Sequence, residues 1–299
     1  MKYAWIDKHR QDYSTTLMCE LLAVSRSGLN AARVRVPSKR AQDDERLLAQ
    51  VRQAQRRHRG RYGRRRMATE ISQAQGRAVN EKRVAWVMRE HGLQSHKRRR
   101  FRVVTTDSKH AYPVAPNVLE RDFEATAPNQ KRLADTTYVP TKEGWLYLAL
   151  VLDLYARKLV GWAMSETMPQ ELTLAALDMA LGWRDPDADL VHYSDRGSQY
   201  VSIRHSERLA EAGVEPSLGS KGDSYDNALA ETINGLYKAE LIHRRAPWKT
   251  KEAVELATLE WVAWFNNHRL LEPIGYIPSA EAEANYYRHL ASQPATVAA

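Results

Sequence analysis

Three acidic residues, Asp135, Asp195 and Glu231, have the types and settings expected of a divalent-metal site. Thirty-five residues separate Asp195 from Glu231. That spacing alone is a weak signal, because with 36 acids among 299 residues a carboxylate falls at any chosen offset about one time in eight. The prediction therefore depends on the local sequence around each acid.

The local sequence around each of the three acids favours a functional role over a chance occurrence of carboxylates at this spacing. Asp135 falls in the middle of an expected strand on the same face as Leu133, where a charge is unfavourable unless something neutralises it. Asp195 ends a buried strand, and Gly197 follows it and permits a sharp turn. Glu231 falls on an expected helix packed beside that end of the sheet. We therefore expect the three carboxylates to converge.

Converging carboxylates predict metal-dependent chemistry on phosphodiesters. They raise one another's pKa and cannot all stay ionised without a compensating cation. Oxygen ligands with open coordination positions favour Mg²⁺ or Mn²⁺. Two such ions can activate a water or a DNA 3′-hydroxyl on one side of a phosphodiester and stabilise the leaving oxygen on the other. The same site can therefore hydrolyse and join, so the acids alone do not separate a nuclease from a strand-transfer enzyme.

Polar residues close to Glu231 in the sequence are candidates for holding DNA. Asn234 and Lys238 follow Glu231 by three and seven residues and share its helix face. The alternative for Lys238 is an exposed lysine on an amphipathic helix. The loop 219–224, which includes Lys221, precedes this helix and is expected to close over substrate.

Other titratable residues fit structural roles better. Asp153 lies beside an expected hairpin and is expected to pair with Arg157 or cap the turn. Glu240 is nine residues beyond Glu231, on the opposite side of the helix, and is a poor ligand. His192 lies near the expected active site, but a structural hydrogen bond is the commoner role for a single histidine.

Composition indicates a soluble, folded protein. The chain has 299 residues, of which 43% are hydrophobic, enough for one large or several small cores. Its single cysteine, Cys19, excludes an internal disulfide framework and offers no cysteine pair for zinc. No apolar run approaches the length of a membrane span, and the N-terminus lacks a signal-peptide core. We expect a cytoplasmic protein.

Positive charge is concentrated in one block. The net charge is +9, but residues 51–102 hold seventeen Lys and Arg against three acids, a net +14 that leaves −5 elsewhere. Such a block favours a polyanionic partner, because unpaired like charges repel one another. The alternative is a solvated helix face. The candidate phosphate contacts in this block are Arg64, Arg65, Arg66, Lys82, Arg83, Arg98, Arg99 and Arg100.

Short helices are expected in the N-terminal half. Residues 15–33 predict two helices separated by a turn, with Ser25 capping the second, in a helix-turn-helix-like pattern. A polar helix is expected from Asp43 to about Arg57. A second unit combines helices 64–75 and 81–90, with Val84, Trp86 and Val87 on the buried side.

The C-terminal half predicts an α/β fold. Strands are expected at 133–139, 145–154, 158–164, 190–194 and 214–218, and helices from 169, at 203–212, at 226 to about 242 and at 251–266. Three antiparallel strands followed by alternating helices and strands is the order of the ribonuclease-H-like fold, with a mixed five-stranded sheet. In that fold the strands that carry Asp135 and Asp195 are neighbours.

Several motifs resemble those of integrase-core transposases of bacterial insertion sequences, specifically the product of the second reading frame in the IS-three family. The matching segments are 134–138, 151–162, 192–200 and 226–231, with a tail motif at 264–269 and 275–281. By position, Asp135, Asp195 and Glu231 match the family's catalytic acids. One departure is Lys131-Arg132, where relatives usually carry apolar or aromatic residues, and it leaves the start of the first strand in question.

The resemblance implies a domain organisation that agrees with these elements. It comprises an N-terminal helical region (1–57), a basic helix-turn-helix-like module (58–97), a linker (98–129), an integrase catalytic core (130–245) and a C-terminal helical tail (246–299).

The resemblance also implies a reaction and partners. The expected enzyme cuts insertion-sequence ends and transfers the 3′-hydroxyl strand to target DNA, using two Mg²⁺ or Mn²⁺ ions. It is expected to form a homo-oligomer on DNA, to work with an upstream-frame protein or as a frameshift fusion, and to associate with the bacterial nucleoid. The alternatives are a nuclease of the same fold that only hydrolyses and a DNA-binding regulator with an inactive core.

Overall fold

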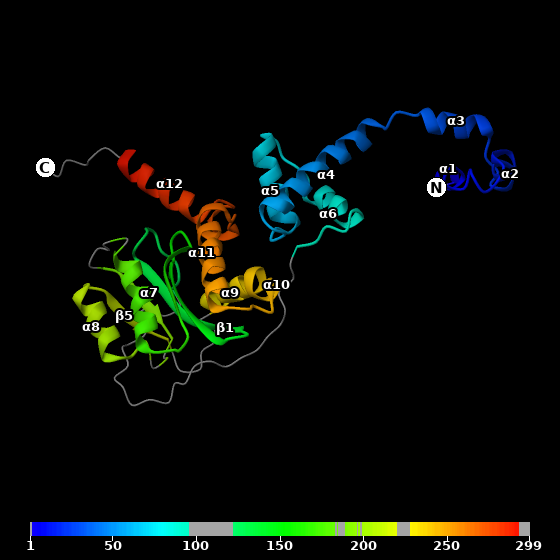
Figure 1. The fold of residues 1–299 in the computed structure, drawn as a ribbon. Helices are drawn as coiled ribbons and strands as arrows, with labels where there is room; N and C mark the ends of the chain where they lie inside the picture. The colour runs from blue at the N-terminus through cyan, green and yellow to red at the C-terminus, as the bar shows by residue number, and fades with distance from the viewer. Residues whose placement is uncertain are drawn as a thin grey trace. The chain divides into compact units, whose positions relative to one another are not determined.

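The computed structural model describes residues 2–95, 122–182, 184, 189–195, 197, 199–219 and 228–292 (Figure 1). It divides into two compact units, one of residues 1–60 and 67–94 and the other of residues 61–66 and 95–299. None of the helices in the described part of the chain has the length and apolar character needed to cross a bilayer.

The first unit is entirely helical. Its elements are α1 (Lys2–Lys8), α2 (Thr15–Leu21), α3 (Arg26–Val34), α4 (Lys39–Arg57), α5 (Arg64–Gln75) and α6 (Glu81–Glu90). The first residues of α5 belong to the second unit. The predicted cap of α3 is confirmed, because Ser25 accepts a hydrogen bond from the Gly28 amide at 3.0 Å. The helix α4 begins four residues earlier than predicted, because Ser38 caps it through the Ala41 amide.

The buried side of α6 differs from the prediction at one residue. Val84 and Val87 are buried as expected, but Trp86 is 41% exposed. Successive residues turn by about 100° around a helix, so Trp86 lies on the opposite side from Val84, and Met88 completes the buried side instead.

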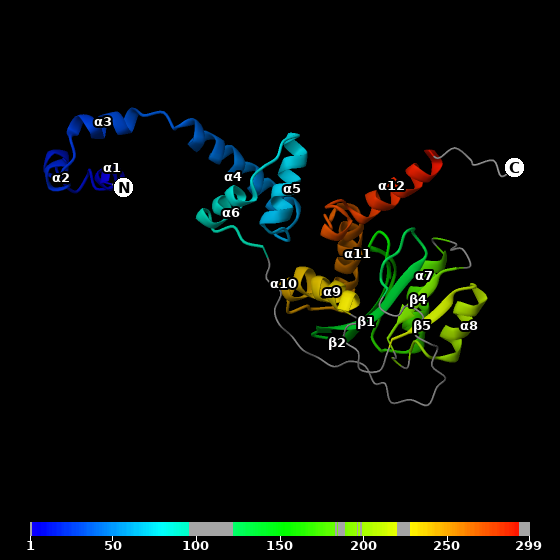
Figure 2. The same ribbon diagram turned by 180° about the vertical axis from the view of Figure 1, so that it is seen from behind.

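The second unit contains the predicted mixed sheet. Its strands are β1 (Lys131–Thr141), β2 (Gly144–Asp153), β3 (Lys158–Ser165), β4 (Val191–Ser194) and β5 (Glu215–Leu218). They lie in the order β3-β2-β1-β4-β5 (Figure 2). The pairs β1–β2 and β2–β3 are antiparallel, whereas β1–β4 and β4–β5 are parallel. This topology confirms the ribonuclease-H-like fold.

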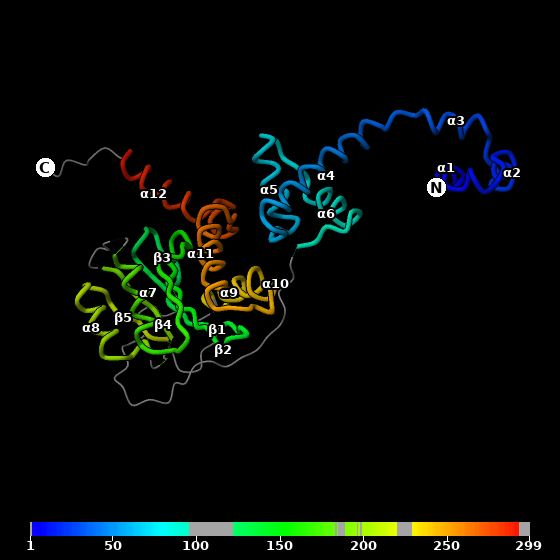
Figure 3. The backbone as a smooth tube through the Cα atoms, viewed as in Figure 1, coloured from blue at the N-terminus to red at the C-terminus, as the bar shows by residue number. Residues whose placement is uncertain are grey.

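Helices cover both faces of the sheet. They are α7 (Gln170–Gly182), α8 (Ile203–Glu211), α9 (Ala228–Tyr237), η1 (Lys238–Ile242), α10 (His243–Arg245), α11 (Lys251–His268), η2 (Glu272–Ile274) and α12 (Ser279–Ser292). Side chains alternate between the faces of a strand, so Ala134 of β1 packs with α7 while Leu133 packs with α9 and α11. The helices α9 and α10 run past the hairpin end of β1 and β2 (Figure 3).

The helix predicted from 226 to 242 is not uniform. The α-helical part ends at Tyr237, and the π-helix η1 follows it. In η1 the buried Glu240 pairs with the buried Arg269 and accepts a hydrogen bond from Trp261 Nε1 at 3.2 Å. Glu240 is therefore structural, as predicted. The predicted first residues of this helix, 226 and 227, lie outside the described residues.

The first strand begins at Lys131, two residues before the predicted start. Arg132 is fully buried there and donates a hydrogen bond to Asn129 Oδ1 at 3.0 Å. Burial lowers the pKa of Arg132 to about 10, and the neighbouring Asp153 opposes this shift. Asp153 in turn accepts a hydrogen bond from the Tyr155 amide, which confirms its role in capping the turn.

The C-terminal segment packs on the five-stranded sheet. Glu283 of α12 pairs with Lys158 of β3 and with Arg184, both at 2.5 Å. The hydroxyl of Tyr62 donates to the carbonyl of His268 at 2.8 Å, and the Leu270 amide donates to that hydroxyl. The tail is therefore part of the second unit, as are residues 61–66.

Candidate active site

The pairing of β1 with β4 brings two of the predicted acids to the same end of neighbouring strands. The parallel pairing of β1 with β4 matches Leu133 with Tyr193, and continuing this register by two residues brings Asp135 level with Asp195. The chain turns directly after β4, where Asp195 Oδ1 accepts a hydrogen bond from the Gly197 amide at 2.9 Å. A Cβ atom at position 197 would lie 3.0 Å from Asp195 Oδ1, so glycine leaves room for the carboxylate.

Tyr200 ties the turn after β4 to β1. Its hydroxyl lies 2.8 Å from Thr136 Oγ1, and its ring is buried. Burial raises the pKa of Tyr200 well above its usual value, and the charges of Asp135 and Asp195 add to this effect. Tyr200 is therefore within electrostatic reach of both carboxylates. Sequence reasoning did not select it, although it lies only five residues after Asp195.

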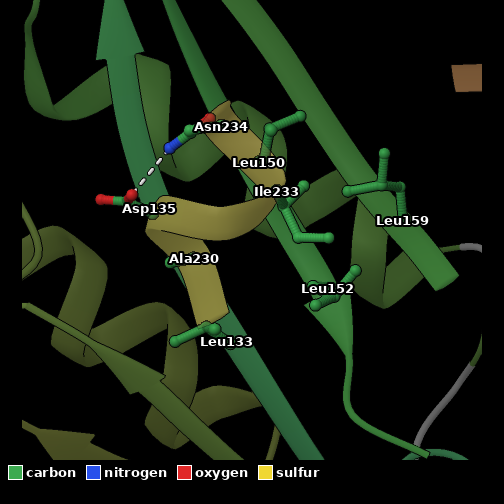
Figure 4. Close-up of a pocket in the computed structure, with 8 residues that line it drawn as sticks. All are labelled: Leu133, Asp135, Leu150, Leu152, Leu159, Ala230, Ile233 and Asn234. Carbon is green, nitrogen blue, oxygen red and sulfur yellow. Dashed lines mark hydrogen bonds between the residues drawn. The ribbon is translucent and has the colours of Figure 1, made fainter. Parts of the chain in front are cut away.

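Asn234 contacts an acid directly. Its Nδ2 atom donates to Asp135 Oδ2 at 2.7 Å, across the space between α9 and β1 (Figure 4). The side chain is 7% exposed, and its Oδ1 atom is buried without a hydrogen-bond partner within the described part of the chain. Asn234 therefore orients the Asp135 carboxylate, a different task from the DNA contact predicted for it.

Lys238 is held close to the same acid. Its Nζ atom lies 4.7 Å from the ring centroid of Tyr138, which is a cation–π contact. Burial lowers the pKa of Lys238, and the charge of Asp135 opposes that shift. The alternative of a fully solvated lysine is therefore wrong, and Lys238 brings a positive charge to the acidic end of the sheet.

Glu231 lies on the helix that packs beside β1. It is exposed on the first turn of α9, three residues before Asn234 and therefore on the same helix face. Among the residues with described positions, no group of three or more His, Cys, Asp or Glu side chains is close enough to hold a metal. Lys221 and the rest of 220–227, which lead into α9, lie outside the described residues. The assembled triad remains a prediction.

The space beneath these residues is too small for a ligand. A cavity of about 10 Å³ lies between α9 and the sheet, and its lining is apolar except for Asp135 and Asn234 (Figure 4). This volume holds one water molecule at most. Substrate would have to meet the acids from the outer surface, as a long polymer can.

The predicted DNA-binding residues of α5 and α6 differ in exposure. Arg64, Arg65, Lys82 and Arg83 have exposed side chains, although Arg65 pairs with Glu272 at 3.6 Å and Arg83 with Asp44 at 2.6 Å. Arg66 is half-buried and donates to the Leu270 carbonyl at 2.7 Å. Residues 98–100 lie outside the described residues, so the structure does not test Arg98, Arg99 and Arg100.

His192 is buried on β4, and its side chain makes no hydrogen bond to any described residue, contrary to expectation. Its ring faces that of His205, with 5.7 Å between centroids, and each side chain is 1% exposed. Burial lowers the pKa of His205 to about 4 and that of His192 well below its usual value. Both histidines are therefore neutral parts of the core at neutral pH.

The chain matches two kinds of protein-family model. Residues 125–224 match the model described as "Integrase core domain", and residues 212–278 match a second model with the same description. Residues 42–101 match the model described as "HTH-like domain". The first matches cover the sheet with Asp135 and Asp195, and the last covers α4, α5 and α6.

Curated relatives are similar over most of the chain. A "Putative transposase for insertion sequence element IS986/IS6110" of Mycobacterium tuberculosis is 43% identical, over 85% of this chain and 92% of its own length. The "Transposase for insertion sequence element IS629" of Shigella sonnei is 42% identical, over 94% and 95%. "Transposase InsF for insertion sequence IS3A" of Escherichia coli K12 is 40% identical, over 81% and 84%.

Among solved structures, similarity extends to retroviral proteins. The HTLV-2 integrase catalytic core domain in complex with magnesium is 14% identical, with a TM-score of 0.43, and the match covers 54% of this chain and 99% of that one.

Proposed function

Because the chain belongs to the IS3-type family of insertion-sequence transposases with an integrase core domain, we propose that it cleaves the ends of its element and joins their 3′-hydroxyls to target DNA. Members of this family act in DNA transposition and are polynucleotidyl transferases. The observation that carries the proposal is the placement of Asp135 level with Asp195 on neighbouring parallel strands, with Asn234 of α9 bonded to Asp135.

The donor atoms fit a divalent cation. Two carboxylates at the same level of adjacent strands repel each other unless a cation lies between them. Asp135, Asp195 and Glu231 would hold two Mg²⁺ or Mn²⁺ ions. When bound, the ions would lower the pKa of the attacking water or hydroxyl and stabilise the leaving oxygen.

The surrounding side chains prepare the site for substrate. Asn234 fixes the orientation of the Asp135 carboxylate through its amide hydrogen bond. Tyr200 holds the turn that carries Asp195 against β1. Lys238 supplies a positive charge beside Asp135, where it can bind a phosphate of the DNA end. We propose that Lys221 approaches the same DNA from the loop before α9.

The basic helical unit is proposed to hold DNA while the core reacts. Exposed Arg64, Arg65 and Lys82 would contact phosphates, together with the basic string at 98–100. Because both ends of an element must be brought together, we further propose that the chain works as a homo-oligomer on DNA, either with an upstream-frame protein or as a frameshift fusion.

Two DNA substrates that differ only at the 3′ terminus distinguish strand joining from hydrolysis. Labelled duplexes of the element end, with either a 3′-hydroxyl or a 3′-deoxy terminus, are incubated with the protein, Mg²⁺ and a target plasmid. The proposal predicts that label joins the plasmid only from the 3′-hydroxyl duplex. Cleavage of end DNA without any joining would favour the hydrolysing nuclease, and DNA binding without cleavage would favour a regulator with an inactive core.

A further inference from the structure

A large aromatic side chain is exposed at the hairpin end of the catalytic sheet. Trp145, near the start of β2, is 51% exposed. Its ring contacts only one other described ring, that of Tyr138 on β1, edge to face with 5.0 Å between centroids. A singly exposed aromatic side chain is common on protein surfaces, so the groups around Trp145 decide whether it binds a partner.

The hairpin that carries Trp145 is fixed in place. Thr141 Oγ1 donates to the Gly144 carbonyl at 2.7 Å, across the turn itself. Outside the turn, the Lys142 amide donates to the Trp248 carbonyl at 3.0 Å. The Lys251 amide donates to Glu143 Oε2 at 2.9 Å. A ligand that packs on Trp145 would therefore lose little free energy to ordering the protein.

The aromatic pair lies beyond Asp135 along β1, toward the hairpin end, and its side chains leave the strand on the face opposite to that of Asp135. Tyr138 is three residues along β1 from Asp135, and Pro140, which pairs with Trp145, is five residues along. At about 3.3 Å per residue these separations are about 10 and 16 Å. A DNA strand advances about 3.4 Å per nucleotide along the duplex axis, so this surface lies within about five nucleotides of the acids.

Positive charge accompanies the aromatic rings. The Lys238 ammonium lies over the Tyr138 ring, and the charge of Asp135 raises the pKa of Lys238 against the effect of burial. Around the hairpin turn, Lys142 and Lys249 are exposed. Aromatic rings combined with basic side chains are how proteins bind single-stranded nucleic acid, because bases stack on the rings while the cations meet phosphates.

We infer that Trp145, supported by Tyr138, is a stacking site for an unpaired nucleobase of the DNA end, within about five nucleotides of the phosphate that reacts. The inference rests on the proposed function, which places DNA at Asp135 and Asp195. The base must be unpaired, because bases inside a duplex already have both faces covered by their neighbours. Separation of the terminal base pairs would expose such a base beside the acids.

The test compares forked and fully paired DNA. The forked duplex carries the fluorescent base 2-aminopurine in its unpaired arm, and binding is measured in an Asp195→Asn background that leaves the DNA uncut. Trp145→Ala is expected to weaken binding of the forked duplex roughly 5- to 100-fold and to abolish the quenching of 2-aminopurine. Binding of the fully paired duplex should change less than about twofold.

Two further variants serve as controls. Trp145→Phe keeps an aromatic ring and should retain most of the preference for forked DNA. Tyr287→Ala removes a ring of similar exposure, 46%, from α12, elsewhere in the same unit, and should leave the preference unchanged. An equal effect of Trp145→Ala on both DNAs, or no effect on either, would overturn the inference.

Failure of the inference can be told from failure of the proposed function. If the wild-type protein joins element ends but Trp145→Ala binds forked DNA normally, only the stacking site is wrong. If the wild-type protein neither cuts nor joins element ends, yet prefers forked DNA in a Trp145-dependent way, the stacking site stands and the proposed reaction is wrong.

Discussion

Asn234 connects the helix that carries Glu231 to the strand that carries Asp135. Its amide donates to one oxygen of that carboxylate and so orients it. Because Glu231 lies one helical turn earlier, a fixed Asn234 also limits where Glu231 can move. The same hydrogen bond therefore acts on two of the three proposed ligands.

Replacing Asn234 by alanine should weaken the response to metal. A partner that holds a metal ligand typically contributes 10- to 100-fold in metal affinity or activity. We expect Asn234→Ala to need roughly 10- to 100-fold more Mg²⁺ for half-maximal cleavage while binding DNA normally. A magnesium titration of cleavage at saturating DNA measures this. An unchanged titration, in a variant with wild-type unfolding behaviour, would show that Asn234 does not position the acid.

The elements could be predicted from the sequence wherever the pattern is local. The strands β1 to β5 and the cap Ser25 follow from alternation and capping residues, and the observed bounds agree within a few residues. The π-helix η1 could not be predicted, because it accompanies the contact of Glu240 with Arg269, 29 residues away. Long-range packing of this kind has no signature in a short stretch of sequence.

The candidate site could be predicted only in part, because some of its contacts join residues that are far apart in the sequence. Asp135 and Asp195 follow from their positions on neighbouring strands, once the fold is known. The contact of Asn234 with Asp135 spans 99 residues, and that of Tyr200 with Thr136 spans 64. The sequence therefore predicts a DNA contact for Asn234, which shares a helix face with Glu231. The burial of Asn234 in the structure gives it a positioning role.

At the element scale, the exposed cations of α5 and α6 should control the salt dependence of DNA binding. Each phosphate contact contributes about 0.9 to the slope of log K against log salt. Neutralising Arg64 and Lys82 together should lower the slope by up to about 1.8, as measured by binding titrations at several salt concentrations. Arg204→Gln, which removes an exposed cation from α8 on the catalytic unit, is the control. An unchanged slope would assign Arg64 and Lys82 to a solvated face.

The buried histidines of β4 and α8 should make the second unit acid-sensitive. The folded-state pKa of His205 is about 4, whereas the unfolded chain takes up a proton near pH 6.5. Between these values the unfolded state binds more protons, so stability falls as pH falls from about 6.5 to 4. The loss is up to about 3 kcal/mol for His205.

Urea unfolding of the wild type and His205→Leu at several pH values measures this effect. Stability of the wild type should fall more steeply with acid than that of the variant, because the variant lacks the group that takes up the proton. Parallel pH profiles would mean that the carboxylates alone cause the acid sensitivity.

At the scale of the whole molecule, the proposed reaction requires more than one copy. Each chain carries one set of the proposed acids, while two element ends must be held together. The free protein is expected to be monomeric, because its basic block repels the same block in another copy until DNA neutralises it. Light scattering with and without paired end DNA should show at least two protomers only on DNA. A one-protomer complex that joins two ends would contradict this.

The central claim is that Asp135, Asp195 and Glu231 perform the chemistry together, and a strand-transfer assay with labelled element ends and Mg²⁺ tests it most directly. Asp135→Asn, Asp195→Asn and Glu231→Gln should each abolish both cleavage and joining while DNA binding persists, because each removes a metal ligand and no basic surface. Asp153→Asn, which alters the buried turn, should reduce stability rather than chemistry. Near-normal strand transfer by any one of the three variants would contradict the account.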